Sequence, residues 1–223
     1  ARDEDGAAFS DQQLLGQLHI LLVAGHETST ILSSWLLYLL ATNPECRERV
    51  RAEIDAVLAT TDGAITLEAV KAMRLLGYVV NEAGRLYSPV GNVPRGTLNP
   101  VTFNGHTIPA GARVLVSLAG CHRLPQIFAE PNRFDPDRYA PPREEDKRNP
   151  YALVPFGGGP RICIGINFAQ VEVKALAAHV LRHVDLTPAL DHPPAHTYYG
   201  ITASLPDGMP MHVKSVSGEN AGV

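Results

Sequence analysis

Apolar residues recur three and four positions apart over the first part of the chain, which is the spacing that places them on one face of a helix. Ser10 and Gln13 precede this run with the spacing of a capping box. The pattern therefore predicts a long helix from near Asp11 to about Thr42.

Further helical patterns follow the first one. Pro44 suits the first position of a second helix, which we expect to reach about Ala59. A shorter helix should follow Thr66, and an apolar stripe predicts another from Leu75 to Tyr87. Together these segments make the first ninety residues a helical region.

The pattern changes after Val93 to short runs with the alternation of strands. Asn-Gly at the centre of Val101–Ile108 is a strong hairpin signal, and Arg113–Leu118 should form another strand. A proline-rich segment from Pro131 to Pro155 has little periodicity, so we expect a coil that wraps over the surface.

The last part of the chain combines a helix and a hairpin. The helix should run from about Cys163 to Arg182. Pro206-Asp207-Gly208 lies between Ile201–Leu205 and Met211–Val213, which predicts that these two runs pair as strands. The expected fold class is mainly α with small β-sheets (α+β), in a single domain.

Hydropathy, net charge and cysteine spacing argue against several classes of function. The apolar stretch from Leu14 to Leu40 is interrupted by polar residues, so we interpret it as a buried helix rather than a membrane span. A net charge of −4 without a basic stripe argues against a nucleic-acid partner. Cys46, Cys121 and Cys163 include no C-x-x-C pair, so they predict neither a disulfide framework nor a zinc site.

The most informative segment is a glycine loop that runs from Phe156 to Gly165 and contains Cys163. A cysteine at a helix N-terminus meets the positive end of the helix dipole, which favours a thiolate able to bind a soft metal. The alternative is that Cys163 is a small buried hydrophobic residue, as lone cysteines often are.

The spacing F-x-x-G-x-R-x-C-x-G resembles the haem-binding loop of the cytochrome P450 family. It is filled here by Phe156, Gly159, Arg161, Cys163 and Gly165. The resemblance implies that the chain binds haem b and that Cys163 ligates its iron. It also implies that Gly157, Gly159 and Gly165 let the backbone approach the ring, while Phe156 shields the sulfur from water.

A second motif, Ala24-Gly25-His26-Glu27-Thr28-Ser29, interrupts the first helix. Zinc-protease chemistry is excluded because H-E-x-x-H would need a histidine where Thr30 stands. A structural alternative is that Thr28 bonds to the carbonyl four residues back and bends the helix. The motif resembles the oxygen-activating A-G-x-E/D-T-T/S stretch of the same family, which implies that Glu27 and Thr28 deliver protons and that Gly25 leaves space above the iron.

Glu82 and Arg85 form a third motif, E-x-x-R. Taken alone, such a pair is usually an exposed contact of small energy. Its place in the chain resembles the family's structural E-x-x-R pair, which bonds to an arginine in the later coil. Arg133 in Pro131-Asn132-Arg133-Phe134 matches that arginine, so the three residues are expected to hold the cysteine loop in place.

The resemblance also implies contacts with the rest of the haem and with substrate. Arg95 and Arg161 match positions that pair with haem propionates, and an arginine fork suits a carboxylate. His122 is a weaker candidate for the same contact, with backbone hydrogen bonding as its alternative. The expected substrate walls are mostly apolar and consist of Val23, Ala24, Val90, Val93, Tyr199 and Ile201.

The resemblance covers nearly the whole chain, as the C-terminal portion of one cytochrome P450 domain from the oxygen-activation helix onward. We divide it into a helical region (1–90), a β-hairpin region (91–120), a coil with the cysteine loop (121–165), and the last helix with a C-terminal hairpin (166–223). One departure is Gly84, where relatives carry a large apolar residue and which is expected to loosen that helix. The other is length, because the N-terminal half of the family's domain is missing.

The leading hypothesis is a haem-thiolate monooxygenase that uses O2 to oxidise a lipophilic small molecule. Its electrons would come from NAD(P)H through a ferredoxin or flavoprotein reductase, and the missing N-terminal half would be a further partner. The alternatives are a peroxygenase or isomerase of the same family, or a truncated non-catalytic haem-binding fragment. The motifs suit a soluble, cytoplasmic protein of bacterial type, with an anchor in the missing part still possible.

Overall fold

The computed structural model describes residue 6, residues 8–199 and residues 202–216. Its helices are α1 (Asp11–Thr42), α2 (Pro44–Leu58), α3 (Leu67–Ala72), α4 (Arg74–Leu86), α5 (Leu118–Cys121) and α6 (Ile166–His183), with 3-10 turns η1 (Ala59–Thr61), η2 (Pro136–Tyr139), η3 (Glu145–Lys147) and η4 (Gly159–Arg161). Its strands are β1 (Asn92–Gly96), β2 (Val101–Phe103), β3 (His106–Ile108), β4 (Arg113–Ser117), β5 (Val184–Pro188), β6 (Thr197–Tyr199), β7 (Thr202–Ser204) and β8 (Met211–Ser215).

Helix α1 begins and ends where the sequence predicts. The Ser10 hydroxyl accepts a hydrogen bond from the Gln13 backbone N–H, and the Gln13 side chain accepts one from the Ser10 N–H, so the capping box is present. Its C-terminal half, residues 31–41, is largely buried, whereas residues 11–27 are exposed. The expectation of a buried helix therefore holds for only half of α1.

Helix α1 also has the length and composition needed to cross a membrane. Among the described residues it is the only helix that is both long and apolar enough to do so. Core helices of soluble proteins can have the same length and composition.

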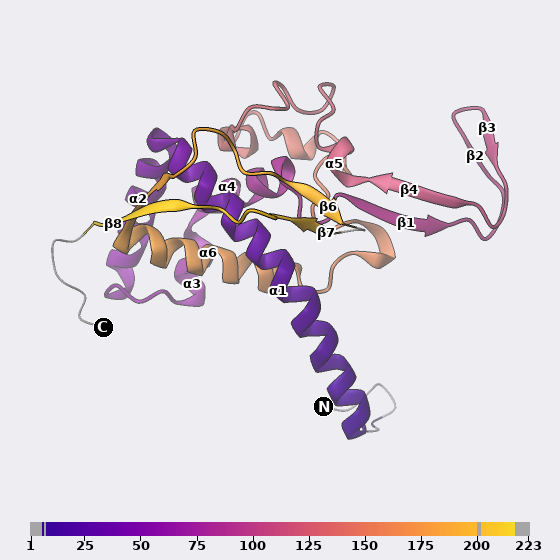
Figure 1. Cartoon of the computed structure of the whole chain (residues 1–223), viewed down its shortest axis with the longest axis horizontal. Helices are drawn as coiled ribbons and strands as arrows, with labels where there is room; N and C mark the ends of the chain where they lie inside the picture. The colour runs from indigo at the N-terminus through magenta and orange to yellow at the C-terminus, as the bar shows by residue number, and fades with distance from the viewer. Residues whose placement is uncertain (1–5, 7, 200–201, 217–223) are drawn as a thin grey trace.

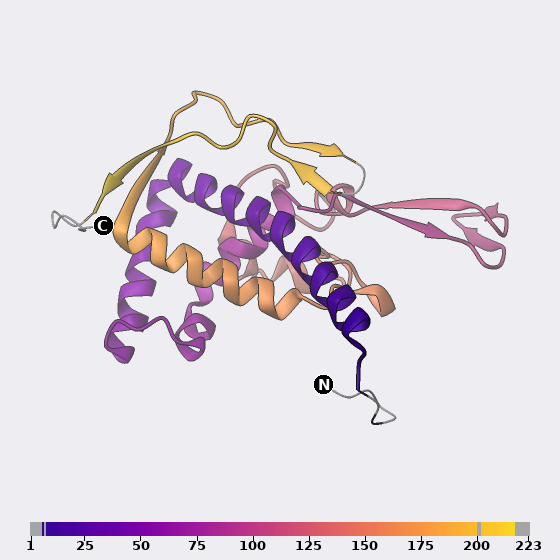
Figure 2. The same cartoon turned by 60° about the horizontal axis from the view of Figure 1, so that its bottom comes forward.

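Five helices share one apolar core. The C-terminal half of α1 packs with α2, α3, α4 and α6, and the buried side chains include Leu36, Ile54, Leu76 and Val173. Figure 2 shows α6 running beside α1, with the C-terminal strands along another side of α1. This packing fixes α1 and α6, the two helices that carry the oxygen-activation and cysteine motifs, relative to each other.

The central strands form two antiparallel pairs. Strand β2 pairs with β3 as the Asn-Gly hairpin predicts, with Phe103 opposite His106. Strand β1 pairs with β4, and Pro94 is tolerated because the sheet has only two strands, so an edge is always available. In Figure 1 these strands extend away from the helical body.

The predicted C-terminal hairpin is wrong in its pairing. Strand β8 pairs with β5, directly after α6, and β7 pairs with β6 instead. The turn at Pro206-Asp207-Gly208 does form, with Gly208 N–H donating to the Leu205 carbonyl at 2.9 Å. It connects β7, which pairs with β6, to β8, which pairs with β5. The buried Ala203 on β7 belongs to the same apolar cluster as Trp35 of α1.

Candidate functional site

The cysteine loop is closed by its own backbone. The Cys163 N–H donates to the Phe156 carbonyl at 2.9 Å, and the Gly157 N–H donates to the Val154 carbonyl at 2.9 Å. Gly157 and Gly159 have φ values of +75° and +69°, a region that favours glycine. These two glycines let the chain turn tightly enough to present Cys163.

The thiol of Cys163 is free and exposed. Helix α6 begins at Ile166 with Gly165 as its N-cap, so the helix starts three residues later than predicted and Cys163 lies just before its first turn. A Cβ at Gly165 would lie 3.7 Å from the Cys163 sulfur. Glycine at this position keeps the side of the sulfur open to a ligand.

The surroundings of the thiol fit an iron porphyrin. Ile164 and Phe168 are apolar yet 92% and 73% exposed, so a flat apolar ligand would remove them from water. Arg161 and Arg95 are also exposed, and within the described part of the chain neither forms an ion pair with a carboxylate. By chemical type, a soft sulfur donor suits iron, an apolar surface suits the ring, and guanidinium groups without a carboxylate partner among the described residues suit the propionates.

Phe156 is half-buried at the start of the loop. Its backbone carbonyl holds Cys163, while the role of its ring beside the sulfur stays a prediction.

The oxygen-activation motif lies in an unbroken part of α1. The Thr28 hydroxyl donates to the Ala24 carbonyl at 2.7 Å, which is the bond of the structural alternative, and Glu27 is exposed. A Cβ on Gly25 would meet no atom within 4 Å, so this face of α1 is open. The proton-delivering role of Glu27 and Thr28 stays a prediction.

A contact that sequence reasoning missed connects this motif to the cysteine helix. The Ser29 hydroxyl donates to the Glu172 carboxylate at 3.0 Å, which links α1 to α6 one residue after Thr28. Residues 143 positions apart make this bond, and no local pattern signals such a pairing.

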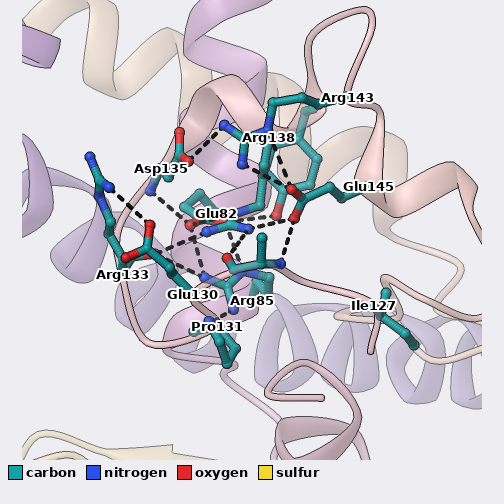
Figure 3. A network of polar contacts seen from close by, with 12 residues as sticks. Glu82, Arg85, Ile127, Glu130, Pro131, Arg133, Asp135, Arg138, Arg143 and Glu145 are labelled. Carbon is teal, nitrogen blue, oxygen red and sulfur yellow. Dashed lines mark hydrogen bonds and ion pairs between the residues drawn. The ribbon is translucent and has the colours of Figure 1, made fainter. Parts of the chain in front are cut away.

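Glu82 and Arg85 form a completely buried ion pair on α4 (Figure 3). The Arg85 guanidinium donates twice to the Glu82 carboxylate, at 2.8 and 2.9 Å. It also donates to the carbonyls of His122, Pro131 and Arg133, at 2.9, 2.6 and 3.2 Å. A single helix side chain therefore holds three points of the coil that leads to the cysteine loop.

The Arg133 side chain does not join the Glu82–Arg85 pair, so this expectation was wrong. The Arg133 guanidinium is 66% exposed and pairs with Glu130, and only its backbone carbonyl meets Arg85. The arginine that reaches Glu82 is Arg138, which is buried and lies 3.1 Å from the Glu82 carboxylate (Figure 3). It also pairs with Glu145 at 2.6 Å.

The sequence does contain the signal for Arg138. Pro136-Asp137-Arg138-Tyr139 has the same P-x-R-aromatic spacing as the segment around Arg133. The Tyr139 hydroxyl donates to Glu82 at 2.9 Å, and burial raises the pKa of Tyr139 well above 10, so the phenol stays a donor. The second motif, not the first, supplies side chains to the buried network.

The network reaches the cysteine loop through His122 and Val154. His122 is buried, its carbonyl accepts from Arg85, and its Nε2 accepts from the Val154 N–H at 2.9 Å. The Val154 carbonyl in turn accepts from Gly157. The path from Arg85 to the loop thus consists of consecutive hydrogen bonds.

The contact between His122 and a haem propionate stays a prediction, and Nδ1 is the ring nitrogen that is left to make it. With Nε2 engaged by Val154, the proton of the neutral ring is on Nδ1, which has no hydrogen-bond partner among the described residues. Burial lowers the pKa of His122 to about 4, so the ring is neutral at pH 7.

Gly84 brings α4 close to the loop. A Cβ at Gly84 would lie 3.3 Å from the Cβ of Pro155 and 3.7 Å from Leu32. Pro155 directly precedes Phe156, so the missing side chain lets the buried helix pack against the base of the cysteine loop. Gly84, the departure from the family pattern, is therefore accommodated because Pro155 and Leu32 pack closely against it.

The structure places the predicted substrate residues on several elements. Val90 forms an antiparallel bridge with Thr202 of β7, and Val93 on β1 is opposite Val116 of β4. Val23 and Ala24 are exposed on α1. Tyr199 is the last residue of β6, and Ile201 lies outside the described residues.

The chain was compared with known proteins. The sequence profile of the family described as "Cytochrome P450" matches residues 1–206. Mouse "Cytochrome P450 4X1" is 38% identical over 97% of this chain and 42% of the mouse protein. Pig "Taurochenodeoxycholic 6 alpha-hydroxylase" is 36% identical over 97% of this chain and 42% of the pig protein.

Solved structures give a matching result. The structure "Retinoic acid bound cyanobacterial CYP120A1" superposes with a TM-score of 0.88 at 32% identity, over 97% of this chain and 49% of that one. The fold described above is therefore a portion of the fold of that protein. The chain spans less than half the length of these relatives.

Proposed function

Because the chain belongs to the cytochrome P450 family, we propose that it provides the haem-thiolate portion of a monooxygenase acting on a lipophilic organic substrate. The observation that carries this proposal is the free, exposed thiol of Cys163 in a closed loop that hydrogen bonds connect to the buried Glu82–Arg85 pair. A structural cysteine would be expected to be buried.

Cys163 would hold the iron through its thiolate, and Arg161 and Arg95 would bind the two propionates. When bound, haem supplies the redox chemistry by which one oxygen atom of dioxygen enters the substrate and the other leaves as water. Glu27 and Thr28 would hold and pass protons at their carboxylate and hydroxyl groups, on the face that Gly25 leaves open.

The substrate and partners belong to the same proposal. Val23, Ala24, Val90 and Val93 are apolar, which supports a lipophilic substrate. Two relatives carry names that refer to taurochenodeoxycholic 6 alpha-hydroxylation and to bound retinoic acid. Electrons would come through a ferredoxin or flavoprotein reductase in the cytoplasm, and further polypeptide of the same domain would cover the exposed half of α1.

The test is the spectrum of the reduced protein with carbon monoxide. We expect a strongly red-shifted Soret band for the haem-loaded chain and for the control variants Cys46→Ser and Cys121→Ser, because the shift requires a thiolate ligand. Cys163→Ser should lose this band. A red-shifted band that survives in Cys163→Ser would refute the assignment of the ligand.

One observation favours the second candidate, a non-catalytic haem-binding fragment: the first half of α1 is exposed and apolar in this chain. Turnover separates the candidates. A monooxygenase oxidises substrate with NAD(P)H and a reductase, a peroxygenase does so only with peroxide, and a binding fragment does neither while keeping the red-shifted band.

A further inference from the structure

A chain of hydrogen bonds joins α1 to the β6–β7 hairpin and to the segment after α4. The indole N–H of Trp35 donates to Nδ1 of His196 at 2.9 Å. Nε2 of His196 lies 3.2 Å from the Tyr198 hydroxyl, which donates to the Ser88 carbonyl at 3.0 Å. Trp35 is completely buried, so its N–H has no access to water as a substitute partner.

The direction of these bonds defines the protonation state of His196. An indole N–H can only donate, so Nδ1 must be the unprotonated nitrogen. The proton of the neutral ring is then on Nε2, which donates to Tyr198, and Tyr198 donates onward to Ser88. Every donor has an acceptor only while His196 is neutral.

The groups around His196 favour the neutral ring. It stands edge-on to Trp35 and Tyr87, whose rings stack with centroids 3.5 Å apart. Burial lowers the pKa of His196, and the positive charge of Arg123 contributes in the same direction, although the Ser88 backbone opposes them. Within residues 8–199 and 202–216 no carboxylate forms an ion pair with His196.

The same hairpin is attached to the segment that contains Val90. The Ala203 N–H donates to the Pro89 carbonyl at 2.7 Å, and Val90 bridges Thr202. The Tyr198 ring fills the space beside Gly91, where an added Cβ would lie 2.5 Å from two ring atoms. The position of the hairpin therefore determines the position of residues 88–91.

We propose that His196 is a positioning residue that fastens the β6–β7 hairpin to α1 and to residues 88–91, and that its protonation releases this attachment. Protonation at Nδ1 would set two N–H donors against each other and leave the Trp35 N–H buried without a partner. The hairpin would then separate from α1 while the helical core stays folded.

The consequence for substrate rests on the proposed monooxygenase function. Tyr199 ends β6, and Val90 lies in the attached segment, so two of the residues expected to line the substrate site belong to the parts that His196 connects. Loss of the attachment should weaken substrate binding more than it slows turnover.

The chain offers a direct probe, since Trp35 is its only tryptophan. We expect the fluorescence of Trp35 in the full chain to change with a midpoint below pH 6.5 as His196 gains a proton. His196→Asn keeps an acceptor for the indole but cannot titrate, so its signal should stay flat. The matched control is His192→Asn, because His192 is exposed four residues away and should leave the titration unchanged.

Hydrogen exchange of the Ala203 amide measures the attachment itself. Its protection should fall several-fold as pH falls from about 7.5 to about 5, because the released state binds a proton that the attached state does not. In His196→Phe, which offers no acceptor, protection should be low at every pH. The proposal is overturned if His196→Asn titrates like the unaltered chain, or if His196→Phe keeps full Ala203 protection at neutral pH.

Turnover by the complete haem-loaded enzyme distinguishes this proposal from the function it rests on. His196→Phe should raise KM several-fold with a smaller change in kcat. If no substrate is oxidised but Ala203 protection still depends on His196, the monooxygenase proposal fails and the positioning role stands. If kcat falls and KM is unchanged, the substrate consequence is wrong.

Discussion

At the scale of single residues, the buried network around Glu82 allows a sharp comparison between two arginines. Arg138→Lys should lower the free energy of unfolding by on the order of 3 kcal/mol, because it removes the fork that meets Glu82 and Glu145 and leaves buried carboxylates short of a donor. Arg133→Lys is the matched control and should cost less than about 0.5 kcal/mol, since its side chain is exposed and pairs with the equally exposed Glu130. Urea unfolding of both variants measures the difference, and equal losses would contradict the assignment.

The same two residues indicate where sequence reasoning reaches its limit. The P-x-R-aromatic pattern occurs twice within nine residues, at Pro131 and at Pro136. Nothing in the spacing tells which arginine turns inward, because that depends on the path of the coil over α4. Glu82 and Arg85 themselves were predictable, since the motif fixes both on one helix face.

At the scale of elements, Gly91 tests the contact between the C-terminal hairpin and residues 88–91. Gly91→Ala should destabilise the chain by roughly 1–3 kcal/mol, because the new Cβ would overlap the Tyr198 ring. Gly96→Ala is the control, as no atom lies within 4 Å of its added Cβ. Urea unfolding gives the energies, and Gly91→Ala should cost less when it is made in the Tyr198→Ala variant, which lacks the overlapping ring. If Gly91→Ala and Gly96→Ala behave alike, the tight contact does not hold.

Helices and sheets differed in how well the sequence predicted them. Helix α1 was predicted to its end residues because its capping box and apolar periodicity are local signals. The β1–β4 pair was missed, and β8 was assigned to the wrong partner, because each pairing joins segments separated by another strand pair, β2–β3 in the first case and β6–β7 in the second. A turn signal such as Pro206-Asp207-Gly208 fixes where the chain bends but not which strand it joins.

At the scale of the whole molecule, Glu145 and His122 both make the stability fall as the pH falls. The pKa of Glu145 is held below its usual value by Arg143 and Arg138, against the opposing effect of burial, so its contribution to stability is lost as the carboxylate is protonated. Burial lowers the pKa of His122 to about 4, whereas an unfolded histidine has a pKa near 6.5. The unfolded state therefore binds the proton first in both cases, and acid favours unfolding.

His122 should dominate this dependence at mildly acidic pH. As pH falls from about 6.5 to about 4, the free energy of unfolding should fall by on the order of 3 kcal/mol through His122 alone, because the unfolded chain takes up a proton that the folded chain does not. His122→Gln retains an acceptor for the Val154 N–H and cannot titrate, so its free energy of unfolding should lose most of this pH dependence and keep only the part due to groups such as His196 and Glu145. The control is His106→Gln, whose exposed ring lies on β3 and should leave the full slope. A slope in His122→Gln as steep as that of the unaltered chain would mean that other groups take up the proton, and the path from Arg85 through His122 to the cysteine loop would then not be the acid-sensitive part of the fold.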